Sequence, residues 1–266
     1  MGYAAGMNLD TFYTDHWREI EDERVARYEE MFVWHDAQRA LLAPADIEAG
    51  HRVLDVGAGP GFFASGLAEL VGSTGQVDGV DINARFVSDA NERFSDRANL
   101  AFHHLADHVL PFEAASFDRV VCKNVLEYVP DLDATLAELK RVLKPGGRVH
   151  VIDSDWGFVV VQPWPKATVD RFFAAAAPAF KSPYIGREIA GRLTEHGFTD
   201  VRVKLSPFVD QAGRGLHVLR NMAGYIDTFS TLPREEVEAL LAQVETALEE
   251  QRFLFVLPQF LVTADG

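Results

Sequence analysis

Apolar and polar residues along the middle of the chain form blocks that predict strands and helices in turn. The first block is Val53–Val56, where apolar residues flank an aspartate and indicate a short buried strand. It runs into the glycine-rich segment Gly57–Gly61, and residues 62–71 then carry apolar side chains at helical spacing. A strand, glycine turn and helix in this order place a small-molecule site over the carboxyl end of the strand.

The same reading continues through the rest of the chain. It predicts further strands at Gln76–Asp81, Leu100–Leu105, Asp118–Cys122, Arg148–Asp153, Asp200–Val209 and Phe253–Ala264. It predicts helices at Asp10–Met31, His35–Leu42, Asn83–Ser95, Asp133–Leu143, a stretch ending at Gly197, Leu216–Phe229 and Pro233–Arg252. Alternating strands and helices are typical of an α/β protein with a mostly parallel sheet.

Composition bounds the class of protein. The chain has 266 residues, of which 48% are hydrophobic, and no linker or repeat divides it, so we expect one elaborated domain. Its single cysteine, Cys122, excludes a disulfide framework and lies in an apolar strand, which favours a core residue. With neither a secretory leader nor a long apolar run, the chain is expected to be cytoplasmic and not membrane-spanning.

Charge narrows the partners. The formal net charge is −15, with 25 basic against 40 acidic residues, whereas nucleic-acid binding requires basic patches. Anionic lipid surfaces are excluded for the same reason. We therefore expect no nucleic-acid or membrane partner, and a small molecule as the substrate.

The glycine spacing distinguishes two cofactors. A dinucleotide-binding loop would carry its third glycine at position 62, where this chain has Phe62, which disfavours a nicotinamide oxidoreductase. Here the third glycine is Gly61, and Asp55 stands two residues before the first glycine. This D-x-G-x-G-x-G loop resembles that of the class I S-adenosylmethionine-dependent methyltransferases. The carboxylate of Asp81, about 20 residues further on, is placed to bind ribose hydroxyls.

Two further motifs carry the resemblance. Leu110-Pro111-Phe112 with Ser116–Cys122 is similar to the ubiquinone/menaquinone-biosynthesis branch of these methyltransferases, and Leu143–Gly147 forms an LKPGG segment before the fifth strand. The resemblance covers roughly Gly50 to Asp155. It implies a Rossmann-like, doubly wound seven-stranded sheet in the order 3-2-1-4-5-7-6, with an added helical cap.

The resemblance also implies the cofactor, S-adenosyl-L-methionine, and how it is bound. Asp81 contacts the ribose, Gly57 and Gly59 lie under the methionine moiety, and Asp107 accepts from the adenine amino group. Asn124, at the end of the fourth strand, edges the methionine moiety. The predicted cofactor contacts are Asp55, Gly57, Ala58, Gly59, Gly61, Asp81, Ile82, Ala106, Asp107, His108, Asn124 and Tyr13.

The chain departs from its relatives at Glu127-Tyr128, where many of them have a histidine pair. The sequence therefore leaves undecided which group removes a proton from the acceptor. The candidates are His16, His35, His108, Glu127 and Asp155, and we take His16, Glu127 and Asp155 as the predicted catalytic residues. No metal-ligand spacing is recognisable, so no metal is predicted.

The flanks should determine the acceptor. Residues 1–45 are predicted to form a helical lid, 46–155 the cofactor core and 156–266 the rest of the sheet with a helical insertion at 211–252. The lid carries an aromatic helical face with Tyr13, His16 and Trp17, and Tyr28 and Trp34 are further predicted contacts. The alternative for this aromatic face is ordinary core. Asp155 and Trp156, after the fifth strand, are candidate acceptor contacts.

The sequence thus predicts an enzyme that transfers a methyl group to an O or N atom of a small apolar or aromatic molecule, as in secondary metabolism. The alternative is a protein of the same fold that binds S-adenosylmethionine but catalyses a non-methylating reaction, or only binds ligand. The chain is expected to be a monomer or a homodimer.

Overall fold

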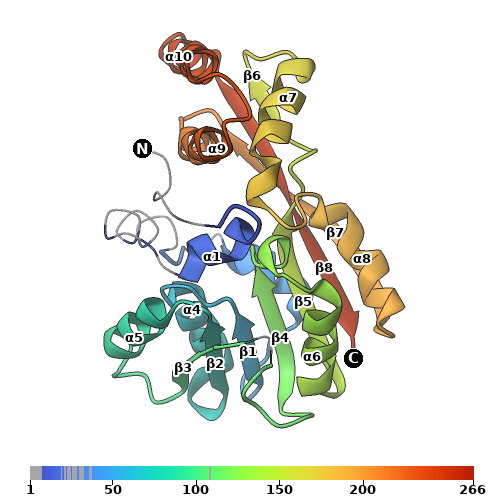
Figure 1. Cartoon of the computed structure of the whole chain (residues 1–266). Coiled ribbons are helices and arrows are strands. Elements are labelled where there is room, and N and C mark those ends of the chain that lie inside the picture. The colour runs from blue at the N-terminus through green and yellow to red at the C-terminus, as the bar shows by residue number, and fades with distance from the viewer. Residues whose placement is uncertain are drawn as a thin grey trace.

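The computed structural model describes residues 8–18, 20, 22, 25, 29, 33–35, 38–107 and 109–266 of the chain (Figure 1). The strands are β1 (Arg52–Val56), β2 (Gln76–Asp81), β3 (Leu100–His104), β4 (Phe117–Lys123), β5 (Leu143–Ser154), β6 (Val160–Gln162), β7 (Thr199–Asp210) and β8 (Leu254–Asp265). The helices are α1 (Phe12–Arg18), α3 (Arg39–Leu42), α4 (Phe62–Val71), α5 (Ala84–Arg93), α6 (Leu132–Val142), α7 (Lys166–Ala176), α8 (Ile185–Glu195), α9 (Gly215–Phe229) and α10 (Arg234–Glu249).

The strands form one sheet in the order β3-β2-β1-β4-β5-β8, with β7 paired to β8. The first five strands are parallel, and β8 runs antiparallel to both β5 and β7. The predicted order is therefore confirmed for the seven predicted strands. The short strand β6 was not predicted; it pairs with Leu254–Val256 of β8, beyond the residues of β8 that pair with β5.

The three largest buried clusters among the described residues hold the layers together. One lies between the sheet and α4, with Leu67, Val77 and Leu261 among its members. A second lies on the opposite face, where α6 and α8 pack against β4, β5 and β8. The third joins α7, α9 and α10 to the far half of β8, above the other two in Figure 1. The two insertion helices between β7 and β8 were predicted, whereas α7 was not.

The amino-terminal segment is described only in part. Within the predicted helix Asp10–Met31 the structure has α1 over Phe12–Arg18, and most of the remaining stretch lies outside the described residues. The second predicted helix begins at Arg39 and not at His35. A turn precedes it, because the N–H of Gln38 donates to the carbonyl of His35 and the side chain of Gln38 accepts from the N–H of His35.

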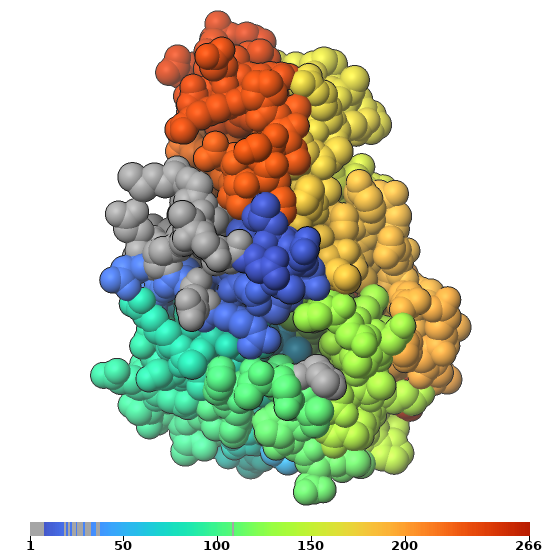
Figure 2. Space-filling view, viewed as in Figure 1, coloured from blue at the N-terminus to red at the C-terminus, as the bar shows by residue number. Residues whose placement is uncertain are grey.

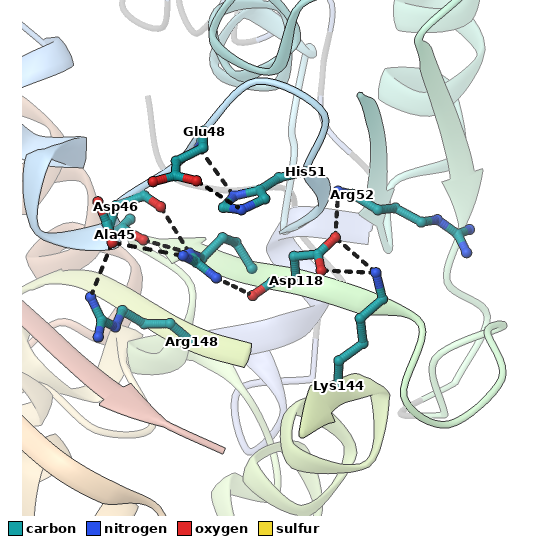
Figure 3. Close-up of polar contacts among 9 residues, drawn as sticks. Ala45, Asp46, Glu48, His51, Arg52, Asp118, Lys144 and Arg148 are labelled. Atoms are coloured by element: carbon teal, nitrogen blue, oxygen red, sulfur yellow. Dashed lines mark hydrogen bonds and ion pairs between the residues drawn. The ribbon is translucent and has the colours of Figure 1, made fainter. Parts of the chain in front are cut away.

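Ion pairs brace the amino-terminal edge of the sheet, where the parallel strands begin (Figure 3). Asp118 accepts hydrogen bonds from the Lys144 ammonium at 2.8 and 2.9 Å and from the Arg52 backbone N–H at 2.8 Å. Although partial burial acts to raise the pKa of Asp118, these bonds hold it below its usual value. Arg148 pairs with Asp265 at 2.8 Å. The charged groups at this edge serve to join strands.

Candidate active site

The glycine-rich loop joins the carboxyl end of β1 to α4. Gly57, Gly59 and Gly61 all have left-handed φ angles, of +73°, +51° and +86°. A Cβ atom on Gly57 would overlap the Val125 side chain, and one on Gly61 would lie 2.7 Å from Phe102. A Cβ on Gly59 would meet no atom within 4 Å. Gly57 and Gly61 therefore allow close packing, whereas Gly59 borders open space over the strand ends.

Asp81, at the end of β2, is tied to this loop. Its carboxylate accepts the Gly59 N–H at 2.7 Å and the Asn83 N–H at 2.8 Å. Asn83 in turn is the N-cap residue of α5, since its side chain accepts from the backbone N–H groups of Arg85 and Phe86. Burial raises the pKa of Asp81 in spite of the N–H groups that it accepts. The loop and β2 are thus held together at the carboxyl edge of the sheet.

Asp55, inside β1, is the least satisfied carboxyl group of the site. Its side chain is buried, and within the described residues Oδ2 has no hydrogen-bond partner. Burial raises its pKa to about 7, which outweighs the attraction of Lys123. Burial likewise lowers the pKa of Lys123. Both groups are therefore pushed toward their neutral forms, as expected when charge is removed from water without a close partner.

A second unsatisfied oxygen lies at the end of the neighbouring strand. Asn124 follows β4 with a left-handed φ of +54°, a conformation that asparagine tolerates. Its backbone N–H donates to Ile152 at 2.8 Å, but its buried Oδ1 has no partner in the described part of the chain. β1 and β4 are adjacent, with Val56 opposite Cys122. Buried acceptors without donors are rare in folded proteins, so both oxygens point to a ligand that donates.

The remaining predicted cofactor contacts lie at the ends of β2 and β3. The Ile82 carbonyl is 3.1 Å from His104 Nε2. Ala106 and Asp107 are exposed, and Asp107 accepts the Val109 N–H at 2.8 Å in a local turn. His108 and Tyr28 lie outside the described residues. Ala58, in the loop, is buried, and the Lys181 ammonium lies over the ring of Tyr13.

Aromatic rings form a wall beside these strand ends, which we call the aromatic wall. Tyr128 stacks on Phe180 with centroids 5.3 Å apart, and Phe180 contacts Trp156 and Tyr225 at 5.2 and 5.6 Å. These residues come from four separate parts of the chain. Sequence reasoning did not single out Phe180, since no local motif surrounds it.

Glu127 stands behind the aromatic wall. Its buried carboxyl accepts the Trp156 indole N–H at 2.7 Å. Burial and the nearby Asp153 raise the pKa of Glu127 well above its usual value, and burial raises that of Asp153 to about 7. The predicted catalytic Glu127 is thus a carboxyl that favours its protonated form and fixes the orientation of Trp156.

The lid residues join the core to the insertion. His16 is fully buried; its ring stacks on Phe12 at 4.5 Å, and its Nε2 lies 3.4 Å from the Tyr225 hydroxyl on α9. The Thr14 hydroxyl donates to the Tyr128 carbonyl at 2.6 Å. Asn83 donates to the Trp17 carbonyl at 2.9 Å. The α1 helix therefore lies over the carboxyl ends of the strands, between the sheet and α9, as Figure 2 shows for the blue segment.

Two other predicted residues lie in different surroundings. Asp155 is fully buried, and both its oxygens bind Arg187, at 2.5 and 2.6 Å. Trp34 packs against α4, where a Cβ on Gly66 would lie 2.5 Å from its ring. The indole N–H of Trp34 is buried and finds no acceptor among the described residues. The carboxylate of Asp155 is thus used in an ion pair. The indole N–H of Trp34, by contrast, is a donor without an acceptor among the described residues, and it lies beside α4.

Within the described residues, every helix is too short or too polar to traverse a bilayer. Nowhere in the described ranges do three or more His, Cys, Asp or Glu residues gather closely enough to bind a metal ion. The site is instead defined by a glycine loop, acidic strand ends and an aromatic wall. These features define the class of Rossmann-like proteins that bind a nucleoside-containing ligand at the carboxyl edge of the sheet.

Comparison with known proteins gives the family. The family model described as "Methyltransferase domain" matches residues 47–204. The ubiquinone/menaquinone biosynthesis C-methyltransferase UbiE of Cellvibrio japonicus is 38% identical over 119 residues, which are 44% of this chain and 48% of that protein. The chain belongs to the methyltransferase-domain family and is similar to UbiE over about half of that protein's length, so the predicted resemblance is confirmed. The chain spans about half the length of the first curated relatives that it matches.

Solved structures share the fold at low identity. Phosphoethanolamine N-methyltransferase 2 of Haemonchus contortus, in complex with phosphomonomethylethanolamine and S-adenosylhomocysteine, aligns with a TM-score of 0.64 and 19% identity. The alignment covers 97% of this chain and 60% of that one. The [4+2]-cyclase SpnF aligns with a TM-score of 0.55 and 19% identity, over 86% and 80% of the two chains. One fold therefore includes a protein named for methyl transfer and one named for cyclisation.

Proposed function

We propose that this chain binds S-adenosyl-L-methionine and transfers its methyl group to an O or N atom of a small apolar or aromatic acceptor. The observation that carries the proposal is a pair of buried oxygens, Asp55 Oδ2 and Asn124 Oδ1, that have no partner among the described residues and lie on adjacent strands beside the open space at Gly59. A cationic, donor-rich ligand suits these acceptors, and the amine and sulfonium of S-adenosylmethionine provide that charge.

The cofactor residues are assigned on the same basis. Asp81 would accept from the ribose hydroxyls, Asp107 from the adenine amino group, and the Gly57–Gly59 backbone would lie against the methionine moiety. The bound cofactor supplies an electrophilic methyl group on a good leaving group. The protein therefore mainly has to orient the acceptor, and positioning alone can contribute about 7–11 kcal/mol.

The acceptor side is proposed to be the aromatic wall. Tyr128, Trp156 and Phe180 supply apolar area, which favours a largely apolar or aromatic acceptor. Glu127 is the proposed proton acceptor when it is ionised, because burial raises its pKa and a carboxylate with a raised pKa is a stronger base. Asp155, bound to Arg187, is proposed to position the loop that follows β5. His16 is proposed to hold the lid against Tyr225.

The lid is also a proposal. Residues 1–45 would exclude water from the transferring methyl group, residues 46–155 would bind the cofactor, and residues 156–266 would complete the sheet and the acceptor cap. The contacts from Thr14 to Tyr128 and from Asn83 to Trp17 support it, since they tie α1 to two strand ends. Excluding water strengthens the electrostatic interactions inside a site.

The direct test is to measure S-adenosylhomocysteine release with a panel of phenols, amines and thiols. We expect turnover with at least one apolar acceptor, and an acidic pH limit on kcat that moves or disappears in Glu127→Gln. Matched binding titrations should give tighter binding of S-adenosylmethionine than of NADH. Tighter NADH binding, or no cofactor binding, would contradict the proposal.

Carbon methylation is the second candidate, favoured by the curated relative named as a C-methyltransferase. Mass and NMR analysis of the product distinguishes a new C–CH₃ group from O–CH₃ and N–CH₃ groups. A non-methylating reaction, of which the cyclase SpnF is an example on this fold, would convert an acceptor while S-adenosylmethionine stays unconsumed. The same assay therefore separates the three.

A further inference from the structure

Exposed apolar side chains gather on one face of the outer sheet. Among the residues that the structure describes, nine large hydrophobic side chains are exposed, and six of them lie on or beside β6, β7 and the adjoining loops. Their exposed fractions run from 38% to 53%. These six, together called the outer face, are Phe158, Val160, Tyr184, Val203, Leu205 and Val209.

Strand register shows that the outer face is continuous. Val160 of β6 and Val209 of β7 both lie opposite Val256 of β8, so three valines form one row across the sheet. Leu205 lies opposite Phe260, whose ring contacts Phe158 at 5.5 Å. Directly opposed residues project to the same side of a sheet, so these side chains share a surface.

The other side of the same strands is ordinary core. Phe208, Phe255 and Leu257 alternate with the outer-face residues and pack toward α9 and α10. A sheet with one face in the core normally carries polar residues on the other. Here valine, leucine and proline occupy that second face, which indicates that something covers it.

The outer face also carries an arginine of the kind that anchors interfaces. Arg187 lies 5.2 Å from the Phe158 ring and 5.0 Å from the Tyr184 ring, and its charge is balanced by the buried Asp155. A rigid arginine between two aromatic rings is typical of the centre of a protein interface. Because Asp155 neutralises it, covering this arginine does not bury an unpaired charge.

The open edge of β7 is less suited to docking than the face. Pro207 lies opposite Pro258, and neither has an N–H, so the two form a non-hydrogen-bonded pair. The nitrogen of Pro207 therefore points to the open edge, which lacks a donor near its middle. Proline at an edge strand prevents strand addition. This leaves packing of face on face as the way to cover the apolar surface.

We propose that the outer face packs against the outer face of a second copy of this chain across a two-fold axis. The exposed side chains amount to on the order of 500 Å² per chain, within the range in which an exposed patch is commonly functional. Two such patches would form the apolar part of the interface. Because the apolar part is roughly 65% of such an interface, the total area approaches the ~1,600 Å² of a standard interface. A largely apolar face that opposes its own copy is self-complementary, as two-fold symmetry requires.

The test is the mass of the purified chain in sedimentation equilibrium. We expect twice the monomer mass of 29.5 kDa, and a dimer weakened at least about tenfold by Leu205→Glu or Val209→Glu. The control is Lys204→Glu, an exposed position on the opposite side of the same strand, which should leave the dimer intact. Unchanged melting temperatures show that each variant is folded.

Cross-linking gives an independent readout. Cys122 is the only cysteine and is buried, so Val209→Cys adds a single accessible thiol. A bismaleimide should join two Val209→Cys chains, and far less of the Lys204→Cys variant. A wild-type chain that is monomeric at all concentrations overturns the proposal. A dimer that is weakened by Lys204→Glu but not by Leu205→Glu also overturns it. The same holds for a monomer that binds phosphatidylcholine vesicles through the outer face.

Discussion

The two edges of the sheet use their charged residues in opposite ways. At the amino edge ion pairs link strands: Lys144 pairs with Asp118 (Figure 3), and Arg148 pairs with Asp265. At the carboxyl edge, Asp55 is buried with an oxygen that has no partner among the described residues. The sheet thus has paired charges at one edge and, in Asp55, a carboxyl oxygen without a partner among the described residues at the other.

The difference separates stability from binding. A paired surface carboxylate contributes little, whereas a buried unpaired one costs free energy and is retained where a ligand compensates for it. The pKa values agree in direction: hydrogen bonds hold that of Asp118 below its usual range, and burial raises that of Asp55 to about 7. Substitutions at the two edges should therefore affect different measurements.

The largest effect is expected for Asp81→Ala at the carboxyl edge. The substitution removes the carboxylate proposed to accept from the ribose, which also accepts the Gly59 N–H. Each hydrogen bond to a charged group contributes about 1.5–3 kcal/mol. We expect S-adenosylmethionine affinity, measured by calorimetry, to fall by about a hundredfold. The matched control is Asp118→Ala, which should lower the melting temperature and leave affinity unchanged. Unchanged affinity in Asp81→Ala would remove the ribose assignment.

Asp55→Asn should stabilise the free protein and weaken cofactor binding. The pKa is about 7 in the folded state against 3.8 for an unburied aspartate, so between these values the folded state holds more protons and stability falls as pH rises. At pH 8 the variant should be more stable by about 4 kcal/mol. Below pH 4 the gain should vanish. Urea titrations at the two pH values measure this, and an equal effect at both would contradict the assignment.

Deleting residues 1–17 tests the lid. The deletion removes Phe12 and His16 from the aromatic cluster and the hydrogen bond from Thr14 to Tyr128. We expect a folded protein whose cofactor affinity falls on the order of tenfold, with a larger loss of turnover, because the site then admits water. Full turnover after the deletion would instead make the aromatic face of α1 ordinary core.

The smallest effect is expected for Lys144→Met at the amino edge. Its ammonium is half-exposed, and partly exposed ion pairs contribute about 0–1 kcal/mol. Stability should fall by no more than that, and cofactor affinity should be unaffected. A clear loss of cofactor affinity in Lys144→Met would show that the two edges are coupled. It would contradict the assignment of stability to one edge and binding to the other.

Local patterns were enough to predict the glycine loop and the strand end that carry the proposed cofactor site. The loop from Gly57 to Gly61, the end of β2 at Asp81 and the N-cap at Asn83 depend on neighbouring residues, so the sequence reveals them. The proposed acceptor half depends on contacts between distant segments. His16 and Tyr225 are in contact although 209 positions separate them in the sequence, and Thr14 and Tyr128 are separated by 114. No local pattern around one residue predicts which distant residue it contacts.

The same limit explains the other differences. β6 has three residues, too few to show a period, and exists because it pairs with the end of β8. Asp155 was predicted as a catalytic group because it follows a strand, but its commitment to Arg187 depends on where α8 packs. The sequence shows that Asp155 is an acid that follows a strand, but it does not show that Arg187 is its partner.

The most direct test is the pH dependence of S-adenosylmethionine binding to the wild type and Asp55→Asn. A cationic ligand beside Asp55 favours the carboxylate, so affinity should rise as pH increases through about 7, with proton release on binding. Calorimetry in two buffers of different ionisation enthalpy measures that proton, which Asp55→Asn should not release. Affinity that is independent of pH in the wild type, or the same proton release in the variant, would contradict the account.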